Sequence, residues 1–428
     1  LLRPDRAPEV DYVFPDTLVY EVAYNSILVK HRREFHLSTA RTLETLYADK
    51  IEQHCDLLAD HFHRSDDDES AIKYLEMAAK RAKNEYANLT AIKRYKELLQ
   101  HKEKLGDLAG QANALYQIGV IAYEIGDYEQ AKEALERAVP LYEAGNDLAN
   151  VGWSVMYVGM VALKQAHYDA AIQHHTRALE LAESRGDTFQ AGIHLTNLAR
   201  VQWRMGAYAR ALDTFEKSLA LKKQNNDLTG QGFAHFYMAL IHMDQGRVEQ
   251  AETALQTCYA LWEQVPNNAR VISYYHQGMG LLALRREQWT AAEAALQQAL
   301  DLSEKLVLKA EIIENLSYLG RAYLGQGKLE VALEMSQRAV RLLAVQKDVE
   351  EAQKVSLNHY YVLMALGLPE ANAFLQAAYA EMLAQANRLS QEEDRKVFLE
   401  NVSVNQEINA RMAREATEEC NRTWVQPR

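Results

Sequence analysis

The apolar and polar positions of the chain follow a pattern that returns about every forty residues. In each repeat a small residue is followed seven positions later by another mostly small residue, and glycine or alanine stands twelve positions before it. The first of these small positions is occupied by Ala131, Ala171, Ala211, Ala251, Ala292 and Ala332. A fixed period of this length indicates that one structural unit recurs along the chain.

A bulky apolar residue stands three positions before each alanine, and a chain breaker such as Gly126 or Gly206 usually precedes it. Polar breakers, for example Gly145-Asn146-Asp147, separate one repeat from the next. The pattern predicts two antiparallel helices per repeat, joined by a tight turn, because small residues let paired helices approach closely. Since one such pair leaves an apolar face uncovered, neighbouring pairs are expected to stack into a curved, open scaffold.

We therefore predict an all-α fold, a right-handed α-solenoid of antiparallel helix pairs, preceded by a small helical remnant. A content of 48% hydrophobic residues with only 7 prolines and 19 glycines agrees with helices. Pro140 falls inside the second helix of its repeat, where we expect a kink.

The repeats resemble the tetratricopeptide family. The segments Gly126-Asp127-Tyr128-Glu129-Gln130-Ala131 and Gly206-Ala207-Tyr208-Ala209-Arg210-Ala211 are similar to its helix-turn-helix signature, and six such repeats cover residues 109–346. The period exceeds the usual length of about 34 residues, which longer helices would explain. The resemblance implies a scaffold that binds a protein or peptide partner.

A second resemblance, to bacterial signalling ATPases of the STAND type, lies at the front of the chain. It rests on Tyr12, Phe14, Leu18, Glu21-Val22-Ala23-Tyr24, Arg32-Arg33, His36 and Leu43-Glu44, and on residues 58–62, 71–75 and 398–402. In that family this segment closes a winged-helix region before a tetratricopeptide sensor, although Asp16 stands here where the family usually has histidine. The sequence contains no G-x-x-x-x-G-K-[ST] phosphate loop, so the resemblance implies an ATPase upstream of this segment.

These patterns divide the chain into five predicted segments. Residues 1–50 end a winged-helix-like or linker region, 51–108 form a helical lead-in, 109–346 hold six repeats, 347–385 a degenerate seventh repeat, and 386–428 a capping helix and tail. In the lead-in, two overlapping frames of small residues share the helix near residues 69–85, which implies one irregular helix where the solenoid begins.

Charge and composition restrict the class of partner. A net charge of -12 without a basic block opposes a phosphate backbone, so we expect no nucleic acid partner. No apolar run of membrane-spanning length is present, and the three cysteines are far apart, which favours a cytoplasmic protein that does not contact a membrane.

Candidate chemistry is sparse. The densest group of ligand-type side chains is His54, Cys55, His61 and His63, but one helix cannot converge four ligands on a metal, so surface histidines are the favoured interpretation. The acidic run at 66–69 precedes a helix and is interpreted as a cap, and Cys258 occupies a small-residue position, which indicates packing. We predict no catalytic residue, no metal, no cofactor and no enzymatic activity.

The first helix of each repeat offers a more informative face, opposite its packed small residue, which we expect to line the inner groove of the solenoid. The predicted groove residues are Tyr116, Trp153, Tyr157, Met160, Asn197, Arg200, Trp203, Phe233, Tyr237, Met243, Tyr274, Gln277, Tyr318 and Arg321. Aromatic, methionine and arginine side chains are enriched at the centres of interfaces. The alternative for any one of them is packing between adjacent repeats.

The sequence thus predicts a protein- or peptide-binding sensor or scaffold arm of a bacterial cytosolic signalling regulator, which restrains or couples to an ATPase or output domain. The alternative is a self-assembly module or free-standing adaptor, in which exposed repeat ends stack and the groove is idle.

Overall fold

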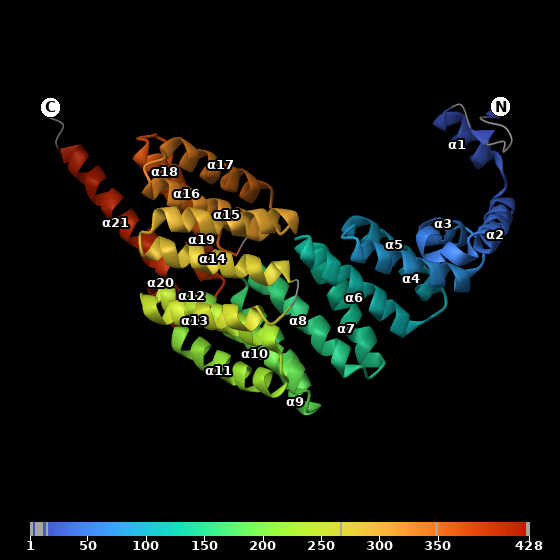
Figure 1. Cartoon of the computed structure of the whole chain (residues 1–428), viewed down its shortest axis with the longest axis horizontal. Helices are drawn as coiled ribbons and strands as arrows, with labels where there is room; N and C mark the ends of the chain where they lie inside the picture. Colours follow the sequence, from blue (N-terminus) through green and yellow to red (C-terminus); the bar gives the residue numbers. More distant parts are fainter. Residues whose placement is uncertain (1–2, 5–11, 14–15, 266–267, 347–349, 425–428) are drawn as a thin grey trace. The chain divides into compact units, whose positions relative to one another are not determined.

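The computed structural model describes residues 3–4, 12–13, 16–265, 268–346 and 350–424, and almost all of them are helical (Figure 1). The chain forms two compact units, Leu1–Ala122 (the first unit) and Tyr123–Arg428 (the second unit). Within the described residues, no helix combines the length and apolar character that crossing a membrane requires.

The first unit begins with a pair of two-residue antiparallel strands, β1 (Arg3–Pro4) and β2 (Tyr12–Val13). The helices that follow are α1 (Thr17–Ser26), α2 (Val29–Leu46), the 3-10 turn η1 (Ala48–Lys50), α3 (Ile51–His63), α4 (Asp68–Asn84), α5 (Asn88–Lys104) and most of α6 (Leu108–Glu124).

Helix α4 packs against both α3 and α5, which confirms the prediction that one helix serves two frames. Its buried Tyr74 ring stacks on Phe62 of α3, with ring centroids 5.3 Å apart. The carboxylate of Asp67 accepts a hydrogen bond from the backbone N–H of Ser70 at 3.0 Å, so the acidic run caps this helix as expected.

The second unit is an array of helix pairs, which confirms the predicted all-α solenoid. After α7 (Tyr128–Ala144) come α8 (Leu148–Lys164) with α9 (Tyr168–Ser184), α10 (Thr188–Arg204) with α11 (Tyr208–Gln224), α12 (Leu228–Asp244) with α13 (Val248–Trp262), α14 (Ala269–Arg285) with α15 (Trp289–Lys305), and α16 (Lys309–Gly325) with α17 (Leu329–Val345). Most of these helices have 17 residues, which accounts for the long period. Helix α7 continues through Pro140, and the expected kink stays a prediction.

The small residues sit where the two helices of a pair approach each other. The alanines that open the repeat pattern, such as Ala171 and Ala211, are fully buried. At Gly159 a Cβ atom would lie only 2.8 Å from the His175 ring, so α8 and α9 are too close there for any side chain. Asp147 accepts a hydrogen bond from the N–H of Asn150 at 3.1 Å, so the polar breaker between repeats caps the next helix.

The tight turn inside each pair requires a left-handed residue, which ends the first helix and reverses the chain. Gly206 fills this position with φ +79°, at no steric cost. Ala166 occupies the same position of the preceding pair with φ +53°, a conformation that is strained for a residue with a Cβ atom.

Beyond the six predicted repeats, α18 (Ala352–Ala365) and α19 (Ala371–Asn387) pack as a seventh pair, followed by α20 (Glu392–Asn401) and α21 (Ser403–Trp424). The sequence predicted a tail after the capping helix, whereas the structure is helical from Ser403 to Trp424.

Residues 388–403, which we call the C-terminal strap, fold back onto the turns of earlier repeats. The Arg388 guanidinium donates to the Gln165 carbonyl at 2.7 Å, the Tyr208 hydroxyl to the Asn401 carbonyl at 3.1 Å, and the Ser403 hydroxyl to Asp244 at 3.0 Å. The buried ring of Phe398 packs against Tyr168, with ring centroids 5.8 Å apart. The solenoid is therefore closed along this edge, which differs from the open scaffold expected, because apolar side chains at the turns are covered by the chain's own end.

Candidate functional site

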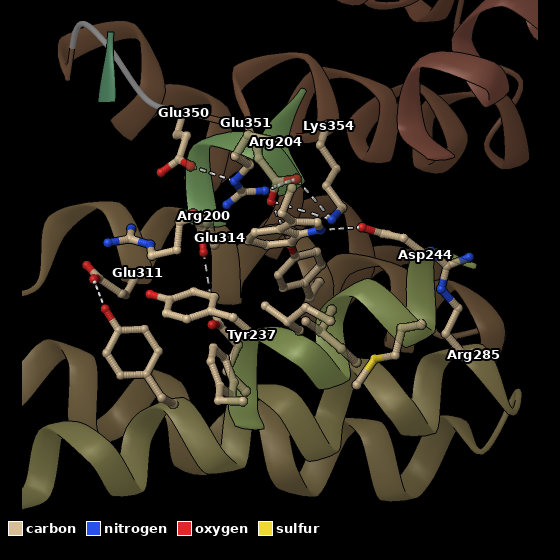
Figure 2. A pocket seen from close by; sticks show the side chains of 18 of the residues that line it. Arg200, Arg204, Tyr237, Asp244, Arg285, Glu311, Glu314, Glu350, Glu351 and Lys354 are labelled. Carbon is tan, nitrogen blue, oxygen red and sulfur yellow. Dashed lines mark hydrogen bonds and ion pairs between the residues drawn. The ribbon is translucent and has the colours of Figure 1, made fainter. Parts of the chain in front are cut away.

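A cavity opens in the second unit where the first helices of five consecutive pairs meet the start of α18; we call it the central cavity (Figure 2). The space between its side chains, solvent at the mouth included, is about 690 Å³. It is lined by Lys164, Arg200, Trp203, Arg204, Phe236, Tyr237, Leu240, Met243, Asp244, Tyr274, Gln277, Leu281, Arg285, Glu311, Glu314, Tyr318, Glu350, Glu351 and Lys354.

Half of the predicted groove residues meet in this cavity, namely Arg200, Trp203, Tyr237, Met243, Tyr274, Gln277 and Tyr318. They come from four neighbouring first helices, α10, α12, α14 and α16. The part of the projected face that lies on these four helices therefore borders the hollow.

The other predicted groove residues pack between helices outside the cavity lining. Trp153 lies edge-on to His194, Tyr157 to Tyr123, and Phe233 to Trp262 and Tyr274. Asn197 is buried, Met160 is half-buried, and Arg321 stacks on Tyr361 with 4.2 Å from the guanidinium carbon to the ring centroid. Tyr116 is half-buried in the first unit.

Most of the charged lining was not predicted. Lys164, Arg204, Asp244 and Arg285 are the last residues of four consecutive first helices, so they share one position of the repeat. Arg204 lies four residues after the predicted Arg200, on the same face of α10 and one turn further along. Extending the projected face by one helical turn would have found these residues from the sequence.

Glu350 and Glu351 precede α18 and reach the end of α10 from far along the chain (Figure 2). Glu350 accepts from Arg204 Nε at 2.5 Å and pairs with Lys164 Nζ at 3.3 Å, while Glu351 pairs with Arg204 Nη1 at 2.8 Å and with Lys354 Nζ at 3.3 Å. Burial works to raise the pKa of Glu350, but Arg204 and Lys164 outweigh it and hold that pKa at about 2. Arg204 and Lys354 likewise outweigh burial and lower the pKa of Glu351, so both carboxylates are ionised at neutral pH.

Neutral donors bind the remaining carboxylates, and Asp244 is also paired with Arg285. The Tyr274 hydroxyl donates to Glu311 at 2.9 Å, the Gln277 amide to Glu314 at 3.2 Å, and the Trp203 indole N–H to Asp244 at 2.8 Å. Burial, followed by repulsion from Glu351, raises the pKa of Glu314 to about 7. This carboxyl group therefore changes its charge near neutral pH.

Arg200 differs from the other cations of the lining. Its Nη1 donates to the Asn197 side-chain oxygen at 3.3 Å, and its guanidinium carbon lies 4.9 Å from the centroid of the Tyr237 ring. Its Nε is buried without a hydrogen-bond partner.

The histidines and cysteines singled out in the sequence do not converge. His54 stacks on Tyr47, while His61 and His63 face His36 and His101 from other helices, at 3.0 Å and 2.9 Å between ring nitrogens. Among the residues that the structure describes, no group of three or more His, Cys, Asp or Glu side chains is arranged to hold a metal ion. Cys55 and Cys258 are buried, and burial raises the pKa of both thiols, which disfavours the thiolate form.

Comparison with known proteins identifies the repeats. A family model described as tetratricopeptide repeat matches residues 88–144, 153–224, 233–305 and 270–344, more than half of the chain. A search of curated protein sequences finds no match.

Two of the matching solved structures share the fold with TM-scores above 0.5, and a third is more distantly similar. Aspartyl phosphate phosphatase F from Bacillus subtilis is 17% identical over 72% of this chain and 76% of that one, with a TM-score of 0.55. The Rap conjugation gene regulator of plasmid pLS20, in complex with the Phr* peptide, is 16% identical over 74% and 96%, also with a TM-score of 0.55. A STAND protein with a tetratricopeptide repeat sensor from Pyrococcus horikoshii is 15% identical over 91% and 58%, with a TM-score of 0.45.

Proposed function

The chain belongs to the tetratricopeptide repeat family, and from that premise we propose that the central cavity binds a protein or peptide ligand. The observation that carries the proposal is the convergence of side chains from five consecutive first helices on one hollow. A site assembled from successive repeats presents the same kind of surface at regular intervals, which suits an extended chain.

The lining supports this proposal by its chemistry. Trp203, Tyr237 and Tyr274 offer large amphipathic surfaces, and Leu240 and Leu281 add apolar area between them. Aromatic side chains with a polar handle, surrounded by fixed charges, are typical of sites that hold peptides by both packing and hydrogen bonding. The similar fold of the pLS20 regulator, whose structure holds a peptide, adds support of the same kind.

Filling the cavity tests the proposal. Leu240 is half-buried in the lining, so Leu240→Trp is expected to occupy the ligand's space and to lower retention of peptides from a random hexapeptide library by about tenfold or more. Leu342→Trp is the matched control, because Leu342 is 38% exposed on α17 and does not line the cavity. Retention is read by size-exclusion chromatography and mass spectrometry, and equal retention by the two variants would refute the proposed site.

We further propose that the chain is the sensor arm of a bacterial cytosolic signalling regulator, coupled to an ATPase or output domain. Support comes from the resemblance of residues 12–47 to the segment that precedes such sensors. The helices α4 and α5, which follow that segment, would carry the coupling. Deleting residues 69–104 from a protein that contains both parts is expected to uncouple ligand from output, and unchanged signalling would contradict the coupling.

Self-association is the second candidate, and exposed apolar side chains on the first unit favour it. Leu18 and Val22 of α1 and Phe35 and Leu46 of α2 are each more than 60% exposed. Light scattering separates the candidates: assembly through this surface predicts concentration-dependent oligomers that Phe35→Asp abolishes and Leu240→Trp leaves intact. A monomer at all concentrations would remove this candidate.

A further inference from the structure

We propose that the ligand of the central cavity carries a carboxylate group and that the guanidinium of Arg200 binds it. This inference rests on the proposed peptide-binding function and specifies the chemistry of the ligand. The carboxylate comes from an acidic side chain or from the C-terminus of a peptide, two sources with the same chemistry.

All but one of the cations in the lining are paired with carboxylates of the protein itself. Lys164 pairs with Glu350, Lys354 with Glu351, and Arg285 with Asp244 at 3.6 Å. Arg204 pairs with both glutamates at the start of α18. Within the described residues, Arg200 is the one cation of the lining that has no carboxylate within ion-pairing distance.

The guanidinium of Arg200 also has a hydrogen-bond donor that the protein does not use. Its Nε is buried and makes no hydrogen bond, its Nη1 donates to the neutral amide oxygen of Asn197, and its plane lies near the ring of Tyr237. The charge of Glu350 acts on Arg200 only from beyond ion-pairing distance. A buried guanidinium is costly unless an anion compensates it, and buried donors are nearly always paired in folded proteins. The side chain as a whole is half-buried and borders the cavity, so an anion that enters the cavity can reach it.

Arg204 shows the contact that Arg200 lacks. The two arginines stand four residues apart on α10, on one face of the helix. Arg204 holds carboxylates from a segment 146 residues away, at 2.5 Å from Nε to Glu350 and 2.8 Å from Nη1 to Glu351. A ligand carboxylate at Arg200 would extend the same mode of binding by one helical turn.

The balance of charges in the lining favours a singly charged group. Asp244, Glu311, Glu314, Glu350 and Glu351 are matched in number by the five cations of the lining, and every cation except Arg200 already pairs with one or two of them. A single guanidinium is therefore left to compensate a ligand, which suits one negative charge better than the two of a phosphate. A planar carboxylate also matches the two parallel N–H donors of a guanidinium.

The test uses the whole chain and three N-acetylated pentapeptide libraries, randomised except at the centre and with aspartate and glutamate left out of the randomised positions. One has a central glutamine and a C-terminal amide, one a central glutamate and an amide, and one a central glutamine and a free C-terminus. We expect at least one carboxylate library to be retained about tenfold more than the neutral library, which identifies the source of the carboxylate.

Variants locate the contact. Arg200→Gln is expected to remove the preference for carboxylate, Arg200→Lys to keep part of it, and Arg321→Gln, which alters a predicted groove arginine outside the cavity, to leave it unchanged. Asn197→Asp places a carboxylate 3.3 Å from Arg200, so it should abolish the preference without lowering the melting temperature. Loss of the preference in a variant of undiminished stability cannot come from misfolding.

The outcomes are distinct. Equal retention of the three libraries, or a preference that survives Arg200→Gln, would overturn the carboxylate inference and leave peptide binding in place. Retention of none of them would contradict the proposed function itself. Displacement of retained peptides by inorganic phosphate, at concentrations where acetate has no effect, would assign the site to phosphate and refute the carboxylate.

Discussion

Arg204 and Glu350 form an ion pair across 146 residues, with 2.5 Å between Nε and Oε1. The side chain of Glu350 is 3% exposed and that of Arg204 14%, so water screens the pair little. The contact joins the end of a first helix to the segment before α18 and forms one wall of the central cavity.

Breaking this pair from one side is expected to destabilise the second unit. Arg204→Met leaves the carboxylates of Glu350 and Glu351 buried without their shared partner, which costs about 3 to 5 kcal/mol. Urea unfolding followed by circular dichroism measures the change in the free energy of unfolding. The control is the double variant Arg204→Met with Glu350→Met, which should recover part of the loss; an additive double variant would show that the two side chains are not coupled.

Acid is expected to weaken the second unit through His175 and His194. Both imidazoles are fully buried and their ring nitrogens lack hydrogen bonds, so burial lowers the pKa of His175 to about 3 and of His194 to about 4. Because an unfolded histidine titrates near 6.5, the unfolded state binds more protons below that pH. As the pH falls from about 6.5 toward its folded pKa, each histidine therefore lowers the free energy of unfolding by about 1.4 kcal/mol per pH unit.

The measurement is urea unfolding between pH 7 and pH 5. His175→Gln should reduce the slope by the contribution of one proton, whereas His31→Gln, which alters an exposed histidine of the first unit, should not change it. A slope that is the same in the His175 variant and the parent would show that this imidazole binds its proton equally well in the folded and unfolded states.

Glu314 gives the opposite dependence. Its pKa is raised to about 7 in the folded protein, so the folded state binds more protons and stability falls as pH rises from about 4.5 to about 7. Glu314→Gln keeps the acceptor for Gln277 and removes this ionisation. The variant should melt at a higher temperature than the parent at pH 8 and at the same temperature at pH 4; an equal difference at both values would exclude ionisation as the cause.

The repeat pattern predicted the second unit well because its evidence is local. Ala171 and Ala211 are buried, Asp147 caps a helix, and half of the predicted groove residues surround the central cavity. Burial of the alanines and capping depend on neighbours within about one repeat, and the groove residues share one face of successive first helices, so the spacing along the sequence is enough to predict them.

The repeat pattern could not predict contacts between segments that lie far apart in the sequence. Glu350 and Glu351 lie outside the repeats' regular helices, and nothing in their spacing indicates a partner on α10. The C-terminal strap was predicted only as a cap, because the apolar surface that it covers at Tyr168 comes from the start of α9, 230 residues before Phe398. A projection of one repeat onto the next cannot show that the end of an array returns to its middle.

The strap is expected to hold the turns of the earlier repeats in place. Phe398 is 1% exposed and packs with Tyr168, so Phe398→Ala removes a buried ring and costs about 3 to 5 kcal/mol if α20 stays docked. Release of the strap limits that cost, but it also breaks the hydrogen bonds from Asn401 and Ser403 to Gly206 and Asp244. Hydrogen exchange distinguishes the two results. Release of the strap predicts faster exchange in α20 and in both turns, whereas a strap that stays docked over the space left by the ring predicts a change only around residue 398.

The control is Phe189→Ala, which removes a ring that is 48% exposed on α10 and should leave both turns protected. Unchanged stability and unchanged exchange in the Phe398 variant would mean that the strap does not close this edge of the solenoid.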